Sequence, residues 1–215
     1  MELVQSVREG PPARAVGSRG ANITGRYPSQ KMARTIQYES RTVEFAHVIL
    51  CETDPEVREY FDQPCQLPLE YKSATGRPVR TTHTPDFLVL GTEYAGFVEC
   101  KAVDSLAKLA EKQPHRYVDA GDGGWQCPPG EDAAARYGLG YRVWTPAGVS
   151  PALIDTARFL EQEWGRSDEV FSDDDVERVL APVRDEPGVR LEDLVAGVGD
   201  PDLVHWCIFC RRIHV

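Results

Sequence analysis

The 215-residue sequence has no long hydrophobic run, no internal repeat and little cysteine. No apolar stretch approaches the roughly 20 residues that a membrane-spanning helix needs, and residues 1–10 lack the basic-then-apolar pattern of a secretion signal. The six cysteines are sparse, and several lie inside apolar runs, which is typical of reduced core cysteines. These absences predict a cytoplasmic protein with no membrane partner.

A surplus of basic residues is also absent: 24 Lys and Arg stand against 34 Asp and Glu, which gives a formal net charge of −10. With 41% hydrophobic and 27% charged residues, the composition is that of an ordinary globular protein and excludes collagen, a coiled coil and a wholly disordered chain. Taken alone, the net charge argues against a nucleic-acid partner, because DNA is a polyanion.

The charge is distributed unevenly along the chain. Residues 1–41 carry seven basic and three acidic residues, residues 42–150 carry 10 and 16, and residues 151–215 carry 7 and 15. Residues 1–37 are predicted to form a flexible basic arm, which suits contact with nucleic acid and suits equally a plain flexible terminus. The net charge then predicts weak DNA affinity for this chain alone, rather than none.

Hydrophobic periodicity and turn residues predict an α/β fold. They predict helices over 40–54, 55–61, 105–117, 133–137 and 151–164, strands over 67–72, 81–90, 94–101 and 141–145, and a loop over 119–130. Beyond these they predict short helices over 173–180 and 191–196 and a strand over 203–213. The order gives a mixed β-sheet core flanked by helices over residues 38–166, followed by a small helical module over residues 167–215.

Three charged residues lie on two neighbouring strands that are otherwise apolar. Asp86 lies on the strand predicted over 81–90, and Glu99 and Lys101 project from the same face of the next strand. A hairpin would place Asp86 beside them. Burying these groups costs several kcal/mol unless they pair or bind a metal. The pattern predicts a Mg²⁺ site at which the lysine orients or deprotonates a metal-bound water, and the alternative is a solvated Glu–Lys pair at a strand end.

Pro85-Asp86 followed by Glu99-Cys100-Lys101 resembles the core motif of the PD-(D/E)xK nuclease superfamily. Further short motifs, in the same chain order, resemble the N-terminal domain of TnsA-type transposase endonucleases over about residues 36–165. These motifs are Glu39-Ser40, Glu44, Asp54-Pro55, Gln63-Pro64, Thr84-Pro85-Asp86, the segment 137–145 and Phe159-Leu160-Glu161. Residues 168–215 loosely resemble a small winged-helix module.

The resemblance implies a restriction-endonuclease-like fold and a Mg²⁺-dependent DNA endonuclease, with Mn²⁺ as a substitute. It implies partners as well: transposon-end DNA, cut at the 5′ ends of the element, a DDE-type transposase subunit and an AAA+ ATPase regulator. Carried over by position, the metal site comprises Glu44, Asp86, Glu99 and the Cys100 backbone carbonyl, and Lys101 is the catalytic lysine. Glu39 is a weaker alternative to Glu44. Gln63 matches a family glutamine of no assigned role.

Two further groups of residues have an open interpretation. Cations beside the predicted site either line DNA or are scattered surface charge; they are Arg77, Arg80, His83, Lys108, Lys112, His115 and Arg116. Metal-like spacing near the C-terminus favours either a zinc site or a buried strand with small cysteines; its residues are His205, Cys207, Cys210 and His214.

Two other function classes remain beside a transposase endonuclease. One is a stand-alone PD-(D/E)xK nuclease in restriction or repair. The other is a catalytically silent nuclease-fold scaffold, which the complete set of Glu44, Asp86, Glu99 and Lys101 disfavours.

Overall fold

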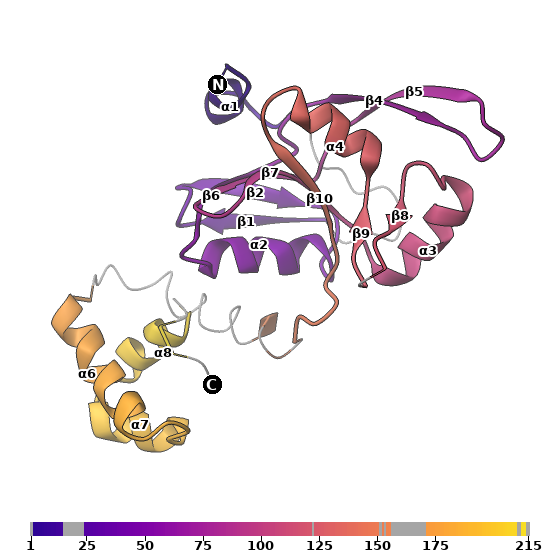
Figure 1. Cartoon of the computed structure of the whole chain (residues 1–215). Coiled ribbons are helices and arrows are strands. Elements are labelled where there is room, and N and C mark those ends of the chain that lie inside the picture. The colour runs from indigo at the N-terminus through magenta and orange to yellow at the C-terminus, as the bar shows by residue number, and fades with distance from the viewer. Residues whose placement is uncertain are drawn as a thin grey trace. The chain divides into compact units, whose positions relative to one another are not determined.

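The computed structural model describes residues 2–14, 24–121, 123–150, 152, 154–155, 171–209 and 212–213. The chain divides into two compact units, one made of Met1–Glu52 and Glu56–Gly148, the other of Thr53–Pro55 and Val149–Val215. The first unit is mixed α/β and the second, over its described residues, is helical (Figure 1).

A four-stranded mixed sheet forms the centre of the first unit, in the order β10-β7-β6-β3. Its strands are β3 (Val57–Asp62), β6 (Phe87–Gly91), β7 (Ala95–Cys100) and β10 (Gly140–Trp144). β3 and β7 run antiparallel to β6, and β10 runs parallel to β7. The predicted mixed sheet flanked by helices is confirmed.

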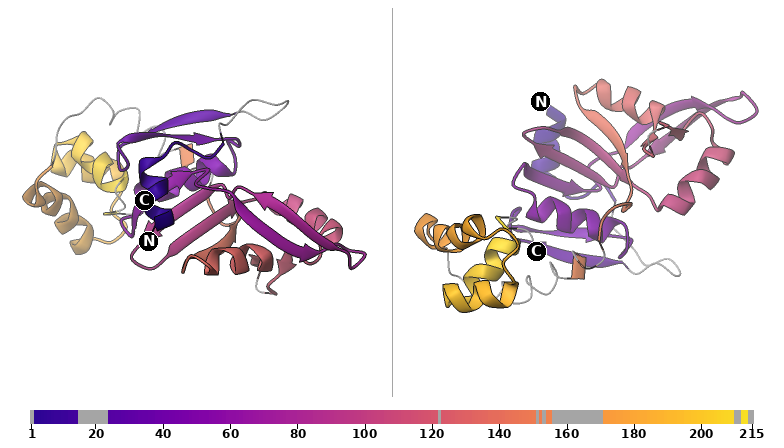
Figure 2. Two further views of the ribbon diagram at one scale, coloured as in Figure 1. Left: turned by 90° about the horizontal axis from the view of Figure 1, so that it is seen from above. Right: turned by 60° about the horizontal axis from the view of Figure 1, so that its bottom comes forward.

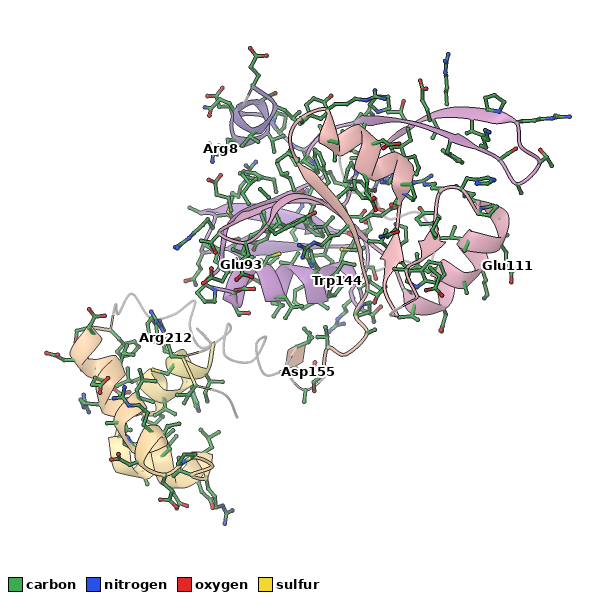
Figure 3. The ribbon with its side chains drawn as sticks, in the orientation of Figure 1. Arg8, Glu93, Glu111, Trp144, Asp155 and Arg212 are labelled. Carbon is green, nitrogen blue, oxygen red and sulfur yellow. The ribbon has the colours of Figure 1, made fainter. Side chains whose placement is uncertain are left out.

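Helices cover the sheet because its strands are apolar on both faces. α2 (Glu44–Thr53) packs through His47, whose ring lies 5.1 Å from that of Phe87 and 4.9 Å from that of Trp144. Trp144 is labelled in Figure 3. α4 (Pro128–Ala135) buries Ala133 and Ala134 in a cluster that includes the following sheet residues: Phe61, Leu88, Phe97 and Tyr141. By strand alternation, Phe87 and Leu88 point to opposite faces, so α2 and α4 cover opposite sides of the sheet.

The N-terminal segment is regular rather than an unstructured arm, so that prediction is wrong for its described residues. α1 (Glu2–Glu9) buries Val7 in the core, and Arg8 pairs with Glu59 at 2.6 Å. β1 (Gly25–Ser29) and β2 (Arg34–Tyr38) form an antiparallel hairpin. The turn of this hairpin is held by the buried Glu52 carboxylate, which accepts hydrogen bonds from Ser29 Oγ, Gln30 N, Lys31 N and Tyr60 OH.

One helix prediction and one strand prediction need correction. The predicted helix over 55–61 is instead β3, whose residues pair with β6 along the sheet. The predicted strand over 81–90 is two strands, β5 (Pro78–His83) and β6, separated at Thr84-Pro85-Asp86. Pro85 has no N–H to continue a ladder, so the chain leaves one sheet there and enters another.

β5 pairs with β4 (Leu67–Lys72) to form a separate two-stranded ribbon, residues 67–83, with register from Leu67↔His83 to Lys72↔Pro78. The ribbon extends away from the rest of its unit in Figure 1 and in both views of Figure 2. α3 (Val103–Lys112) follows β7, and the predicted loop over 119–130 contains the short pair β8 (Val118–Asp119) and β9 (Trp125–Gln126).

The second unit contains three helices over residues 171–209: α6 (Asp173–Asp185), α7 (Leu191–Val198) and α8 (Pro201–Phe209). Ser172 caps α6 by a reciprocal capping box with Asp175. The predicted strand over 203–213 is wrong, because Asp200 accepts a hydrogen bond from Leu203 N and Pro201 starts a helix. No strand occurs within residues 171–209, so a wing is not seen there.

Some predictions fall on other parts of the chain. The predicted helix over 151–164 lies almost entirely outside the described residues. Across the residues that the structure describes, no helix has the length and apolar character needed to cross a membrane.

Candidate functional site

The pairing of β6 with β7 brings Asp86, Glu99 and Lys101 together. Phe87 lies opposite Val98, which places the neighbouring Asp86 and Glu99 on one face. Asp86 Oδ2 accepts a 2.7 Å hydrogen bond from Cys100 N and lies 3.8 Å from Lys101 Nζ. Lys101 Nζ is also 3.1 Å from Glu99 Oε1 and donates to the Cys100 carbonyl at 3.2 Å. The ammonium therefore bridges both carboxylates.

Glu99 is 1% exposed and lies at the centre of a network formed with His83, Lys101, Arg116, Tyr117 and Tyr141. The hydroxyls of Tyr117 and Tyr141 each donate to one Glu99 oxygen at 2.7 Å. Arg116 Nη2 lies 3.6 Å from Oε1. Both carboxylate oxygens are thus engaged. We call this set the Glu99 network.

The hydrogen bonds around His83 form one consistent chain. Arg116 Nη2 can only donate, so it donates to His83 Nδ1 at 3.2 Å. His83 Nε2 then carries the proton and donates to Tyr141 OH at 2.9 Å, and Tyr141 OH donates to Glu99. Burial lowers the pKa of His83 to about 4, so the ring is neutral near pH 7, in agreement with this chain. His83 acts here as a hydrogen-bonding group, not as a cation.

The charges of the network keep Glu99 ionised. Burial raises the pKa of a carboxyl, but here Lys101 foremost, then His83 in its protonated form, Arg116 and the Tyr117 hydroxyl outweigh burial and lower the pKa of Glu99 to about 2. Burial would likewise lower the pKa of Lys101, but Asp86 and Glu99 raise it to about 12. At neutral pH, Glu99 and Lys101 form a buried ion pair.

Glu44 and Asp86 are in the opposite situation. Burial, reinforced by the Asp86 carboxylate, raises the pKa of Glu44 from 4.5 to about 7. Burial also raises the pKa of Asp86, although Lys101 and the Cys100 N–H act against it. Glu44 begins α2 and its Oε2 accepts a 2.7 Å hydrogen bond from Glu39 N. The Glu44 and Asp86 carboxylates therefore repel each other, and Lys101 does not fully compensate their burial and their mutual repulsion.

The donor set fits a divalent cation at Glu44 and Asp86 but not at Glu99. Mg²⁺ prefers carboxylate and carbonyl oxygens together with water. Among the described residues, no group of three or more His, Cys, Asp or Glu side chains is arranged to hold a metal ion. Glu99 has both oxygens occupied by tyrosine hydroxyls and lies next to two cations. The arrangement thus divides the predicted ligand set. Glu44 and Asp86 remain candidate ligands, the Cys100 carbonyl accepts a hydrogen bond from Lys101, and Glu99 pairs with Lys101.

Other predicted site residues are placed as follows. Arg116 is not a surface cation, since its side chain is 14% exposed and belongs to the Glu99 network. Glu39 pairs with Arg14 at 2.9 Å. Gln63 is buried with a positive φ of 44°, and its N donates to the Asp86 carbonyl at 2.9 Å. Gln63 therefore fixes the backbone before the ribbon against the start of β6.

The sequence did not indicate Tyr117 and Tyr141 as site residues, and it indicated His83 only as a cation beside the site. Tyr117, Tyr141 and His83 come from a turn after α3, from β10 and from β5. Tyr141 could have been found only from the parallel pairing of β10 with β7. This pairing places Tyr141 opposite Phe97, two residues before Glu99 on the same strand face. Tyr117 is set by the path of the chain after α3 and has no such signal.

The predicted zinc residues are only partly described. Cys207 lies on α8 and is fully buried among apolar residues of the second unit. Cys210 and His214 lie outside the described residues, so the zinc interpretation stays a prediction.

Comparison with known proteins adds no family to this picture: no family model and no curated protein matches the sequence.

The raised pKa of Glu44 predicts a pH-dependent stability in metal-free buffer. The folded state holds the Glu44 proton more tightly than the unfolded chain, so this stabilisation is complete below about pH 4.5 and is lost as the pH rises through about 7. Glu44→Gln should match the wild type near pH 4.5 and be more stable by about 3 kcal/mol at pH 8. Urea unfolding at the two pH values measures the difference. A stability difference between Glu44→Gln and wild type that is the same at both pH values would contradict the shift.

Proposed function

We propose that the protein is a Mg²⁺-dependent DNA endonuclease with a restriction-endonuclease-like core, which acts as the nuclease subunit of a TnsA-like transposase. The observation that carries the proposal is the bridging of Asp86 and Glu99 by Lys101, with Glu44 in electrostatic reach of Asp86. The proposal also rests on the resemblance of the motifs in residues 36–165, which implies transposon-end DNA, a DDE-type transposase and an AAA+ ATPase as partners.

In the proposed site, Glu44, Asp86 and the Cys100 carbonyl would hold the metal. A bound Mg²⁺ supplies charge stabilisation for a phosphate under attack and lowers the pKa of a bound water. Lys101 orients the nucleophilic water and neutralises charge on the phosphate, because its ammonium is fixed by two carboxylates. Glu99 holds Lys101 in place, and the tyrosine hydroxyls hold Glu99.

A second candidate function is a nuclease-fold scaffold that binds DNA or a transposase without cutting. One observation favours it: both Glu99 oxygens are occupied, so the predicted three-carboxylate site is not assembled among the described residues. The stand-alone nuclease shares the chemistry of the first proposal and differs only in partners.

Cleavage of duplex DNA tests the proposal. We expect the full-length protein to nick a duplex in Mg²⁺ or Mn²⁺, more strongly with the products of adjacent transposase and ATPase genes, and to leave the DNA intact in EDTA. Nicking without those products at an equal rate would favour the stand-alone nuclease. Binding of the duplex without nicking under all these conditions would overturn the nuclease and support the scaffold.

A further inference from the structure

The β4–β5 ribbon is poorly buried for a pair of strands. In β4 only Leu67 and Leu69 are buried, and β5 has no buried residue. Leu67 and Leu69 lie at the end of the ribbon where β4 contacts α4, while most other side chains of the ribbon and its turn are exposed to solvent. An isolated two-stranded ribbon is marginally stable in water. The exposed part of the ribbon therefore contributes little to the hydrophobic core and is available for binding.

The exposed side chains of the ribbon are suited to phosphate. Three basic residues and one acidic residue lie within residues 67–83, a net charge of +2 in a chain of −10. Lys72 and Arg77 flank the turn and make no ion pair with any described residue, and Arg80 meets only the exposed Glu70 at 3.3 Å. Exposed hydroxyls of Thr75, Thr81 and Thr82 lie beside these cations. Such cations and hydroxyls are the usual partners of DNA phosphates.

α3 provides a contrast on the same side of the unit. Lys108 and Lys112 are exposed, but Asp104 and Glu111 lie within one turn of them, so the helix has no net charge. The candidate cations of α3 are therefore part of a balanced surface, and the ribbon is the more basic of the two neighbouring elements.

The ribbon is fixed directly to the candidate site. His83, its last residue, contacts Tyr141 and Arg116 of the Glu99 network. Tyr71 OH donates to Gln113 Oε1 at 3.2 Å, which ties the part of β4 near the turn to the residue that follows α3. From His83 to Arg77 the strand spans six residues, or about 20 Å at about 3.3 Å per residue. That is about six base pairs of B-DNA, at 3.4 Å per base pair.

We propose that the β4–β5 ribbon lies along the axis of duplex DNA and contacts its phosphate backbone about six base pairs from the cleavage point, with Lys72 and Arg77 as its main contacts. The inference rests on the proposed nuclease function, and a two-stranded ribbon has dimensions that fit a DNA groove. Duplex DNA is the committed occupant because the ribbon is basic while the chain as a whole is acidic.

The test compares full-length wild type with Lys72→Ala/Arg77→Ala and with the charge-matched control Arg184→Ala/Arg190→Ala, whose arginines are 61% and 76% exposed in the second unit. Binding of a fluorescein-labelled duplex of about 30 base pairs is followed by anisotropy in Ca²⁺, over a series of salt concentrations. We expect the ribbon variant to bind about 10- to 60-fold more weakly at 0.1 M salt. The slope of log affinity against log salt concentration should be smaller in magnitude by about 1.8 in the ribbon variant, because each lost phosphate contact removes about 0.9. The control should match wild type.

The outcomes separate the two proposals. A wild type that binds and nicks DNA, with a ribbon variant that binds equally well, would overturn the ribbon assignment and leave the nuclease standing. A wild type that neither binds nor nicks DNA, alone or with the adjacent gene products, would overturn the proposed function itself. Circular dichroism and the urea midpoint should be unchanged in the ribbon variant, because both side chains are exposed; a variant that unfolds is replaced by Lys72→Gln/Arg77→Gln.

Discussion

Asp86→Asn is expected to reduce DNA cleavage about 1,000-fold or more. The change removes the negative charge that the proposed metal ion and Lys101 share, while an amide oxygen can still accept the 2.7 Å hydrogen bond from Cys100 N. Electrostatic stabilisation of charge at a phosphate is commonly the largest part of such catalysis, so its loss is not compensated locally. Lys101→Met should have an effect of the same order, since the ammonium bridges both carboxylates.

The matched control is Asp62→Asn on the neighbouring strand β3. Asp62 is also a buried aspartate, 3% exposed, whose pKa is raised by burial, but its partner is Gln37 rather than Lys101. We expect this variant to cleave within about threefold of wild type. Initial rates of duplex nicking under saturating Mg²⁺ provide the comparison. Equal loss in Asp62→Asn and Asp86→Asn would mean that any buried charge change disables the protein, and the site assignment would fail.

Calorimetric titration with Mn²⁺ separates binding from chemistry. Divalent binding should be lost in Asp86→Asn and weakened in Glu44→Gln, because these are the two carboxylates whose charge lacks compensation. Glu99→Gln should keep its binding, because Glu99 already holds Lys101 and two tyrosine hydroxyls. If Glu99→Gln also loses Mn²⁺ binding, Glu99 is a metal ligand together with Glu44 and Asp86, as the sequence predicted.

The elements that the sequence predicted best are those whose local pattern and tertiary surroundings agree. β4, β7 and β10 alternate or run apolar between clear turn residues, and they are strands in the structure. The charged face of the site followed from the same logic, since an antiparallel β6–β7 pair must place Asp86 beside Glu99.

The failures came from segments whose pattern fits two structures. Val57, Tyr60 and Phe61 have helical spacing, yet this stretch pairs with β6 because the sheet offers it an edge. Residues 203–209 are apolar almost throughout, so period alone cannot separate a buried strand from a buried helix; the cap at Asp200 decides for α8. Glu52, which holds the β1–β2 turn from 22 residues away, has no local signature at all.

Glu99→Ala is expected to destabilise the fold by about 3 to 5 kcal/mol. Removing the carboxylate leaves Arg116 without its buried acidic partner and leaves Lys101 with Asp86 alone, at 3.8 Å. It also deprives the Tyr117 and Tyr141 hydroxyls of an acceptor. Glu99→Gln keeps one acceptor oxygen but not the charge, so a smaller loss of about 1 to 3 kcal/mol is expected. The exposed Glu93, at the turn before β7, is the matched control, and Glu93→Ala should change stability by less than about 0.5 kcal/mol.

Urea unfolding measures these differences, with an unchanged slope and a lower midpoint for the Glu99 variants. Their pH dependence identifies the cause. Since the pKa of Glu99 is lowered to about 2, its stabilising contribution is complete above about pH 4.5 and is lost as the pH falls towards 2. The stability difference between wild type and Glu99→Gln should therefore narrow on acidification. The difference for Glu44→Gln also narrows on acidification but has the opposite sign, because there the variant is the more stable protein. A gap that stays constant from pH 7 to pH 3 would mean that Glu99 is held by packing rather than by the charges of Lys101 and Arg116.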